Sequence, residues 1–249
     1  MSIINSDTER RIVMPFMYYS SDSLWTYIIL VLPAVILAMW ASSNVNSTFK
    51  KYSKIPSASG YTGFDAARRI LDANGLHHIR IEHISGNLTD HYDPKAGVIR
   101  LSDAVYSNNS AAAIGVAAHE AGHAVQHATK YFPLAIRNAI IPVCNIGSNL
   151  AMPLILMGLL FEAFGLCYLG IFAFGLSTLF QLITLPVEFN ASRRALAALE
   201  SSGRFSEEDL SNANKTLRAA ALTYVAALAV SLANLLRLVI MVNGRRRND

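Results

Sequence analysis

Residues 24–40 read LWTYIILVLPAVILAMW, an apolar stretch without a single charged residue. A helix over this stretch is roughly 26 Å long at about 1.5 Å per residue, just enough to cross the hydrocarbon core of a bilayer. Trp25, Tyr27 and Trp40 stand near its ends, where aromatic side chains favour the membrane interfaces. The stretch before it is long and no small-residue cleavage site follows, so the sequence predicts a transmembrane helix and not a removable signal peptide.

The composition of the whole chain is typical of a membrane protein. Apolar residues make up 53% of the 249 residues and charged residues 15%, whereas about 25% of a typical soluble domain is charged. The apolar content excludes an intrinsically disordered chain. The net charge of +4 comes with no basic stripe interleaved with aromatic residues, so we expect no nucleic-acid partner. Cys144 and Cys167 lie in apolar stretches and are expected to be small buried side chains, not a disulfide.

Three further apolar segments follow, at 139–161, 165–187 and 219–242. A short turn around Glu162 separates the first two, so we expect an antiparallel transmembrane hairpin. The sequence thus predicts a mainly α, multi-pass membrane protein with a small α+β water-facing domain. The predicted parts are an N-terminal segment (1–23), a transmembrane helix (24–40), a water-facing region (41–138), the transmembrane hairpin (139–187), a helix with a polar loop (188–218), and a C-terminal apolar helix with a basic tail (219–249).

The positions of basic residues predict the orientation, because cytoplasmic loops carry an excess of lysine and arginine. The turn around Glu162 has none, whereas the segments after the first and third spans hold Lys50, Lys51, Lys54, Arg193, Arg194, Arg204, Lys215 and Arg218. This distribution places 41–138 and 189–218 in the cytoplasm. A fourth helix that crosses the membrane would put the basic tail, 245–247, outside. Either that helix does not cross fully, or the other loops outweigh the tail.

The water-facing region has the pattern of a small mixed domain. Residues 64–73 have helical spacing after a weak capping-box signal at Thr62, and Asn74-Gly75 ends the helix. Short strands are expected near 79–84 and at 98–101, with a turn at Asp93-Pro94 between them. An alanine-rich helix then begins at Ser102 or Ser110 and runs to about Lys130.

The sharpest motif lies on this alanine-rich helix: His119-Glu120-Ala121-Gly122-His123, an H-E-x-x-H pattern. Residues four apart on a helix lie about 6 Å apart along the axis and nearly on one face, so two imidazoles can share one Zn²⁺. Glu120 projects beside them, close enough to accept a proton from metal-bound water. The motif therefore predicts zinc as a cofactor, with His119 and His123 as ligands and Glu120 as a catalytic residue.

A catalytic zinc needs a third protein ligand and an open position. His127 lies about 12 Å from His119 along the axis, too far to share one ion; it is expected to line the cleft, to support a ligand, or to have no role. Glu188 is the better third ligand, because a carboxylate at the end of an apolar span is costly unless a partner satisfies it. The hairpin between His123 and Glu188 returns the chain to the same membrane face, as a shared metal requires.

Three stretches together resemble the neutral zinc metallopeptidases of the YugP-like membrane family: residues 90–94 (DHYDP), 116–127 (VAAHEAGHAVQH) and 188–195 (EFNASRRA). The resemblance covers nearly the whole chain, and the chain is distantly similar to the HtpX-type membrane proteases, which also use a later glutamate. It implies a multi-pass membrane zinc protein with an H-E-x-x-H…E site and a zincin-like peptidase domain. Asn190 departs from the family pattern, where an Asp could hold a histidine ligand by a charged hydrogen bond.

The stretch before the second strand has two interpretations. In zinc proteases a histidine, tyrosine or arginine often donates a hydrogen bond to the developing oxyanion, and His91 and Tyr92 are candidates for this catalytic role. Alternatively, Asp93-Pro94 forms a turn and Tyr92 packs underneath it. Arg193 and Arg194 could bind a substrate carboxylate, but they are better explained as positive-inside anchors.

The leading hypothesis is a zinc-dependent endopeptidase at the cytoplasmic face of the cell membrane. Its partners would be peptide or protein substrates, membrane proteins among them, and the lipid bilayer. If the strand at 98–101 is an edge strand, it could pair with an extended substrate. Cleavage inside the membrane is a second hypothesis, disfavoured because the motif helix follows a polar region. A third is a non-catalytic membrane scaffold with a structural or vestigial zinc site. Structural sites usually have four protein ligands, and no cysteine lies near the motif.

Overall fold

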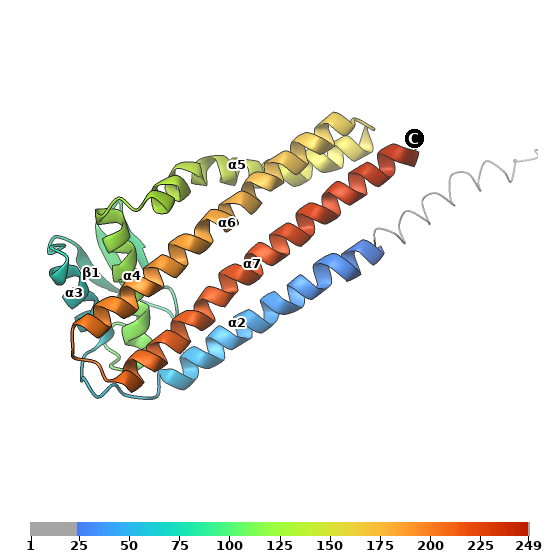
Figure 1. Ribbon diagram of the computed structural model, residues 1–249. Helices are drawn as coiled ribbons and strands as arrows, with labels where there is room; N and C mark the ends of the chain where they lie inside the picture. Colours follow the sequence, from blue (N-terminus) through green and yellow to red (C-terminus); the bar gives the residue numbers. More distant parts are fainter. Residues whose placement is uncertain (1–23, 249) are drawn as a thin grey trace, which may run out of the picture. The chain divides into compact units, whose positions relative to one another are not determined.

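The computed structural model describes residues 24–248, with side chains for 24–246 (Figure 1). The predicted N-terminal segment, 1–23, lies outside the described residues. The structure is mainly helical with one small sheet, as predicted. Its helices are a π-helical turn (Tyr27–Val31), α2 (Leu32–Tyr52), α3 (Gly63–Ala73), α4 (Ala111–Ala128), α5 (Phe132–Leu160), α6 (Phe164–Ser201) and α7 (Glu207–Asn248). The strands are β1 (Arg80–Ile84), β2 (His91–Asp93) and β3 (Val98–Ser102).

Four helical stretches are long and apolar enough to cross a membrane, in agreement with the four predicted spans. They extend well beyond the apolar segments that define them: the first continues to Tyr52 and the last begins at Glu207. The polar loop predicted before the last span is therefore shorter than expected, because α7 already begins at Glu207. Pro142, Pro153 and Pro186 lie inside helices and do not end them. Proline is tolerated there because neighbouring groups can satisfy the freed carbonyl.

The chain forms two compact units. The first, which we call the span unit, comprises the described residues up to 38, 142–179 and 226–248. Within it α5 and α6 approach closely through glycines: a Cβ on Gly147 would lie 3.1 Å from the Ala173 carbonyl oxygen, and one on Gly170 would lie 2.7 Å from that of Ala151. Small residues at helix contacts are the usual basis of packing in membranes. Both cysteines are free and buried, as predicted.

The second unit, the site unit, comprises residues 39–141 and 180–225. Its sheet has the order β1-β3-β2, with β1 parallel and β2 antiparallel to β3. Apolar side chains of β3, α3 and α4 form its core, including Leu71, Ile99, Leu101 and Ile114. The expectation that residues 98–101 could act as an edge strand is therefore wrong, because β3 is central and both of its sides are paired. The open edge on the β2 side belongs to His91–Asp93.

Local capping determines where the helices of the site unit begin. Thr62 and Asp65 form the predicted capping box of α3. Ser110 caps α4, its hydroxyl accepting from the backbone N–H of Ala113 at 3.2 Å, so α4 begins after Ser110 and not after Ser102. Residues 94–97 form the turn predicted at Asp93-Pro94, where Asp93 Oδ1 accepts from the backbone of Lys95 and Ala96. The Ser110 cap thus fixes the start of α4 about two turns before the H-E-x-x-H motif.

Candidate metal centre

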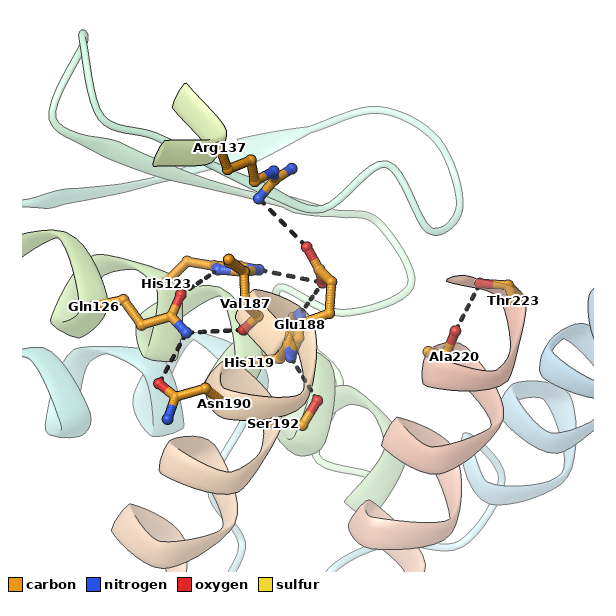
Figure 2. Close-up of polar contacts among 10 residues, drawn as sticks. All are labelled: His119, His123, Gln126, Arg137, Val187, Glu188, Asn190, Ser192, Ala220 and Thr223. Atoms are coloured by element: carbon orange, nitrogen blue, oxygen red, sulfur yellow. Dashed lines mark hydrogen bonds and ion pairs between the residues drawn. The ribbon is translucent and has the colours of Figure 1, made fainter. Parts of the chain in front are cut away.

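Two elements far apart in sequence supply the polar cluster at the centre of the site unit. Helix α4 carries His119, Glu120 and His123, and α6 carries Glu188 (Figure 2). A glycine lets the two helices meet: a Cβ on Gly122 would lie 2.6 Å from the carbonyl oxygen of Ala191. The fourth residue of the H-E-x-x-H motif is thus a point of close contact with α6, one turn beyond Glu188.

The two histidines and Glu188 converge on one point. His119 Nε2 lies 3.2 Å and His123 Nε2 3.5 Å from the same carboxylate oxygen, Oε2 of Glu188 (Figure 2). One ligand atom from each of the three residues lies within 4.8 Å of the others. The side chain of Glu188 is only 4% exposed, and those of His119 and His123 are 15% and 13% exposed. The predicted third ligand and the two motif histidines are therefore brought together in a largely dry environment.

Hydrogen bonds at the far side of each ring orient the histidines. His123 Nδ1 lies 3.0 Å from Gln126 Oε1, while Gln126 Nε2 donates to the Val187 carbonyl at 2.8 Å and to Asn190 Oδ1 at 3.0 Å. Because the Gln126 oxygen can only accept, His123 Nδ1 carries a proton, and Nε2 is the ring nitrogen that faces Glu188. His119 Nδ1 is similarly placed 3.0 Å from Ser192 Oγ. Both Nε2 atoms are thus presented toward Glu188.

Charges around the triad balance its buried carboxylate. Arg137, on α5, lies 3.4 Å from Glu188 Oε1 through its Nη1. Burial by itself lowers the pKa of His123, but its hydrogen bond to Glu188 and the charges of Glu120 and Glu188 outweigh burial and raise that pKa above its ordinary value. A proton and a metal ion would therefore compete for His123, as expected of a metal ligand.

A cavity of about 240 Å³ opens onto these residues. Its walls include all the predicted site residues: His119, Glu120, His123, Glu188, His91 and Tyr92. Glu120 is 9% exposed and lines the same cavity as His119, His123 and Glu188, but it is not part of their cluster. The sequence motif and the later glutamate therefore line one cavity, which is large enough for a few water molecules or part of a peptide.

His91 and Tyr92 occupy the β2 wall of this cavity and are both engaged by neighbours. His91 Nδ1 lies 2.8 Å from the Thr89 carbonyl, and its Nε2 lies 3.3 Å from Arg100 Nη1. The Tyr92 hydroxyl lies 3.1 Å from His127 Nδ1, so His127 is a cleft residue. Burial raises the pKa of Tyr92, which keeps its hydroxyl protonated. The predicted turn begins only after Asp93, so both residues belong to a strand.

The comparisons with known proteins agree with this geometry. Residues 27–243 match the model of the family described as "putative neutral zinc metallopeptidase". The chain belongs to this family. It is also 50% identical over 223 residues to the "putative membrane protease YugP" of Bacillus subtilis (strain 168), which covers 89% of this chain and 99% of the relative. No solved structure matches the chain.

The donor set fits the zinc that the family name implies. Two imidazoles and one carboxylate form a ligand set found in catalytic zinc sites, and the Nε2 atom of each ring would bind the ion once any proton on it has been released. In the described part of the chain, this is the one cluster of three or more His, Cys, Asp and Glu side chains arranged to hold a metal. Each histidine also has the outer hydrogen bond that zinc-binding histidines normally make. His119, His123 and Glu188 could therefore hold one zinc ion.

Sequence reasoning missed four residues of the site. Gln126 and Ser192 had a usable signal, because they lie three and four residues from His123 and Glu188 and so share their helix faces. Arg137 and Tyr224 had none, since each comes from a different helix and reaches the cavity only through folding. Asn190, expected beside a histidine, contacts Gln126 and Arg194 and reaches His123 only through Gln126.

Proposed function

We propose that this protein is a membrane-embedded zinc endopeptidase whose active site faces the cytoplasm. The observation that carries the proposal is the convergence of His119, His123 and Glu188 on one point, with Glu120 in the same cavity. The membership of the chain in a family described as zinc metallopeptidases supports it. His119, His123 and Glu188 would hold the zinc ion. When bound, zinc supplies a Lewis acid that lowers the pKa of a water molecule toward 7 and polarises the scissile carbonyl.

Glu120 acts as the general base and then as the general acid. Its carboxylate lines the cavity but is not one of the clustered ligand atoms, so it is free to exchange protons. It accepts the proton of the attacking water as the carbon–oxygen bond forms, and it delivers that proton to the leaving amine as the carbon–nitrogen bond breaks. A carboxylate in this position accounts for both proton transfers without a second acid.

Donors on the cavity wall stabilise the negative charge that develops on the substrate oxygen. We assign this role to Tyr92 or His91, as the sequence predicts, together with Arg137 and Tyr224, which line the same cavity. Both ring nitrogens of His91 are engaged, by the Thr89 carbonyl and by Arg100. The Tyr92 hydroxyl has one partner, His127 Nδ1, and can turn its proton toward a substrate oxygen when His127 Nδ1 is the donor. Of the two predicted residues, Tyr92 is therefore the better donor.

The length of α6 favours a site at the membrane surface over one inside the bilayer. Glu188 comes 24 residues after the first residue of α6, Phe164, which corresponds to about 36 Å along a straight helix. The hydrocarbon core is about 30 Å thick. A helix that crosses from the turn at Glu162 therefore carries Glu188 to the opposite surface. The excess of lysine and arginine in the segments on that side supports a cytoplasmic location for this surface.

The ligand count favours catalysis over a structural scaffold. Structural zinc sites usually have four protein ligands, whereas catalytic sites keep one position open. The cluster found among the described residues has three members, and a cavity lies against it. Both features are those of a site that admits a water molecule and a substrate.

The proposal is tested with purified wild type and Glu120→Gln in detergent. Zinc per chain is measured for both, and each is incubated with an unfolded casein substrate. We expect about one zinc per chain in both proteins, and cleavage slower by about 100- to 10,000-fold in Glu120→Gln. Wild type that binds zinc but does not cleave unfolded or membrane-protein substrates supports the scaffold hypothesis. Wild type that binds no zinc after metal-replete preparation contradicts the proposal.

A further inference from the structure

A second, larger cavity adjoins the metal site within the site unit. Its volume is about 910 Å³, and it extends from the end of α4 across the β2–β3 turn to residues 76–80. Five residues line both this cavity and the metal-site cavity: Tyr92, Pro94, His127, Leu134 and Asn138. The two cavities therefore adjoin, and Tyr92 and His127, whose side chains are 3.1 Å apart, lie between them. We call the larger cavity the basic groove.

The charges that line the basic groove are all positive. It contains Arg80, Lys95 and Lys130 and no aspartate or glutamate. Arg80 is paired with Glu82 at 2.8 Å. Among the described residues, neither Lys95 nor Lys130 has a carboxylate within 4.0 Å, and both are exposed. The metal-site cavity differs sharply, since Asp90, Glu120 and Glu188 all line it.

The nearest acidic residue does not neutralise the lysines. Asp93 directly precedes the turn that carries Lys95, but its Oδ2 is 3.2 Å from Arg100 Nη1. Its Oδ1 accepts from the backbone N–H groups of Lys95 and Ala96. The carboxylate is thus fully engaged by Arg100 and the turn. Two lysine ammonium groups remain available to a ligand in the groove.

Part of the lining of the basic groove is apolar. Leu76, Ile79 and Leu134 line the groove, and each is buried. An extended polypeptide that leaves the metal site past Tyr92 and His127 would place apolar side chains against this surface. It would then reach the two lysines. The groove therefore matches a peptide segment with apolar residues followed by a carboxylate.

We infer that the basic groove is a substrate subsite that selects polypeptides carrying a carboxylate about three residues from the scissile bond, on one side of it only. The inference rests on the proposed peptidase function. Lys130 lies seven residues beyond His123, or about 10 Å along α4 and its last turn. An extended chain covers about 3.3 Å per residue, so about three residues span this distance. The carboxylate belongs to an Asp or Glu side chain or to the C-terminus of the substrate.

The test uses the full chain in detergent and a neutral fluorescent peptide in which a single Glu is moved through each position on both sides of the cleaved bond. Binding is measured by fluorescence anisotropy to zinc-loaded Glu120→Gln, and kcat/KM is measured with wild type. Each peptide is compared with its Gln counterpart and made with a free or an amidated C-terminus. The comparison of free and amidated C-termini shows whether the groove binds a side-chain carboxylate or the C-terminal carboxylate of the peptide.

We expect Glu to improve binding and kcat/KM over Gln by about 5-fold at one or two adjacent positions on one side. The double variant Lys95→Glu/Lys130→Glu should reverse this preference, so that the Gln peptide is bound and cleaved better than the Glu peptide. Lys54→Glu, an exposed lysine outside both cavities, should leave the preference unchanged. The preference should weaken when salt rises from about 0.05 to about 0.5 M, since exposed charges are screened.

The outcomes separate this inference from the proposed function. Cleavage with no charge preference, or with one that survives Lys95→Glu/Lys130→Glu, contradicts the inference and leaves the peptidase intact. A charge preference in binding without any cleavage by wild type supports the groove and contradicts the proposed function. If the double variant loses affinity for vesicles containing phosphatidylglycerol but keeps the peptide preference, the lysines serve the membrane surface and the inference is wrong.

Discussion

The span unit and the site unit differ in how many polar residues they bury. In the described part of the span unit, Thr178 is the one buried polar residue, and its hydroxyl lies 2.8 Å from that of Ser231. The site unit buries Ser57, Ser102, Ser110, Glu120, Gln126, Thr184, Glu188, Asn190, Asp209, Asn212 and Thr216. Burying a polar group costs free energy unless a partner satisfies it. The site unit offsets this cost in two ways. Gln126, Glu188 and Asn190 belong to the network around His123, and others have local partners, such as Asp90 for Ser102 and Ser206 for Asp209.

The difference shows what each unit is built to hold. The span unit needs only close contact between apolar helices, which Gly147 and Gly170 provide. The site unit must hold a charged carboxylate in place, so it surrounds Glu188 with two histidines and Arg137. Changes in the site unit should therefore act first on metal binding, whereas changes in the span unit should act on stability alone.

The largest effect is expected from removal of the carboxylate itself. Glu188→Ala should weaken zinc binding by more than about 100-fold, because it removes a ligand, whereas loss of an outer partner typically costs 10- to 100-fold. Peptidase activity should disappear with the metal. Zinc affinity is measured by competition with a chelator. Glu200→Ala, which changes an exposed carboxylate on the same helix, is the control; an equal loss in both variants would mean that Glu188 has no special role.

The next effect concerns the amide that orients His123. Gln126→Leu removes the acceptor for His123 Nδ1 and the donor to Val187 and Asn190. We expect zinc affinity to fall by about 10- to 100-fold. Asn190→Ala should cost less, because Asn190 reaches His123 only through Gln126. Competition with a chelator measures the zinc affinity of both variants. A larger loss of zinc affinity in Asn190→Ala than in Gln126→Leu would contradict the idea that Asn190 acts on His123 through Gln126.

Two glycines allow the units to be compared with the same chemical change. A Cβ at Gly122 would lie 2.6 Å from Ala191 O, and one at Gly170 would lie 2.7 Å from Ala151 O. Each Gly→Ala change should cost about 1–3 kcal/mol of overpacking. Gly122→Ala should appear as a zinc affinity lower by about 10-fold, because it separates α4 from Glu188.

Gly170→Ala should instead lower the thermal midpoint of the protein in detergent and leave zinc affinity unchanged. A Cβ on Gly175 would have no atom within 4 Å, so Gly175→Ala is the control for both variants. Equal losses of zinc affinity in Gly122→Ala and Gly170→Ala would show that the two units respond as one, and the comparison would fail.

The smallest effect is expected at the buried polar pair of the span unit. Thr178→Val removes the hydrogen bond to Ser231, and such interhelical bonds in membranes contribute about 0.6 kcal/mol on average. Thermal unfolding in detergent should shift slightly, with zinc content and peptidase activity unchanged. A loss of activity would indicate that this pair supports the site unit after all.

Local and membrane-scale patterns allowed much of the fold to be predicted. The four spans, the turn at Glu162 and the capping box at Thr62 follow from hydropathy and short-range chemistry. The lengths of the two hairpin segments predict that Glu188 and His123 lie at the same membrane face. The structure brings these two residues together.

What could not be predicted depends on contacts between distant segments. The central position of β3 arises because β1 pairs with it in parallel from about twenty residues away, and a five-residue strand carries too little pattern to reveal its neighbours. Arg137 and Tyr224 are ordinary members of helical segments in sequence. They reach the cavity because the parts of α5 and α7 that carry them pack within the site unit. The local sequence pattern does not predict this packing.

The order of the metal ligands along the chain has a consequence for biosynthesis. A ribosome makes His119 and His123 first, then the α5–α6 hairpin, and only afterwards Glu188. The donor set is therefore incomplete until both hairpin segments have been synthesised, and a chain truncated before Glu188 carries both histidines without their shared carboxylate. An activity that depends on a metal held by all three residues would therefore be absent until Glu188 has been made.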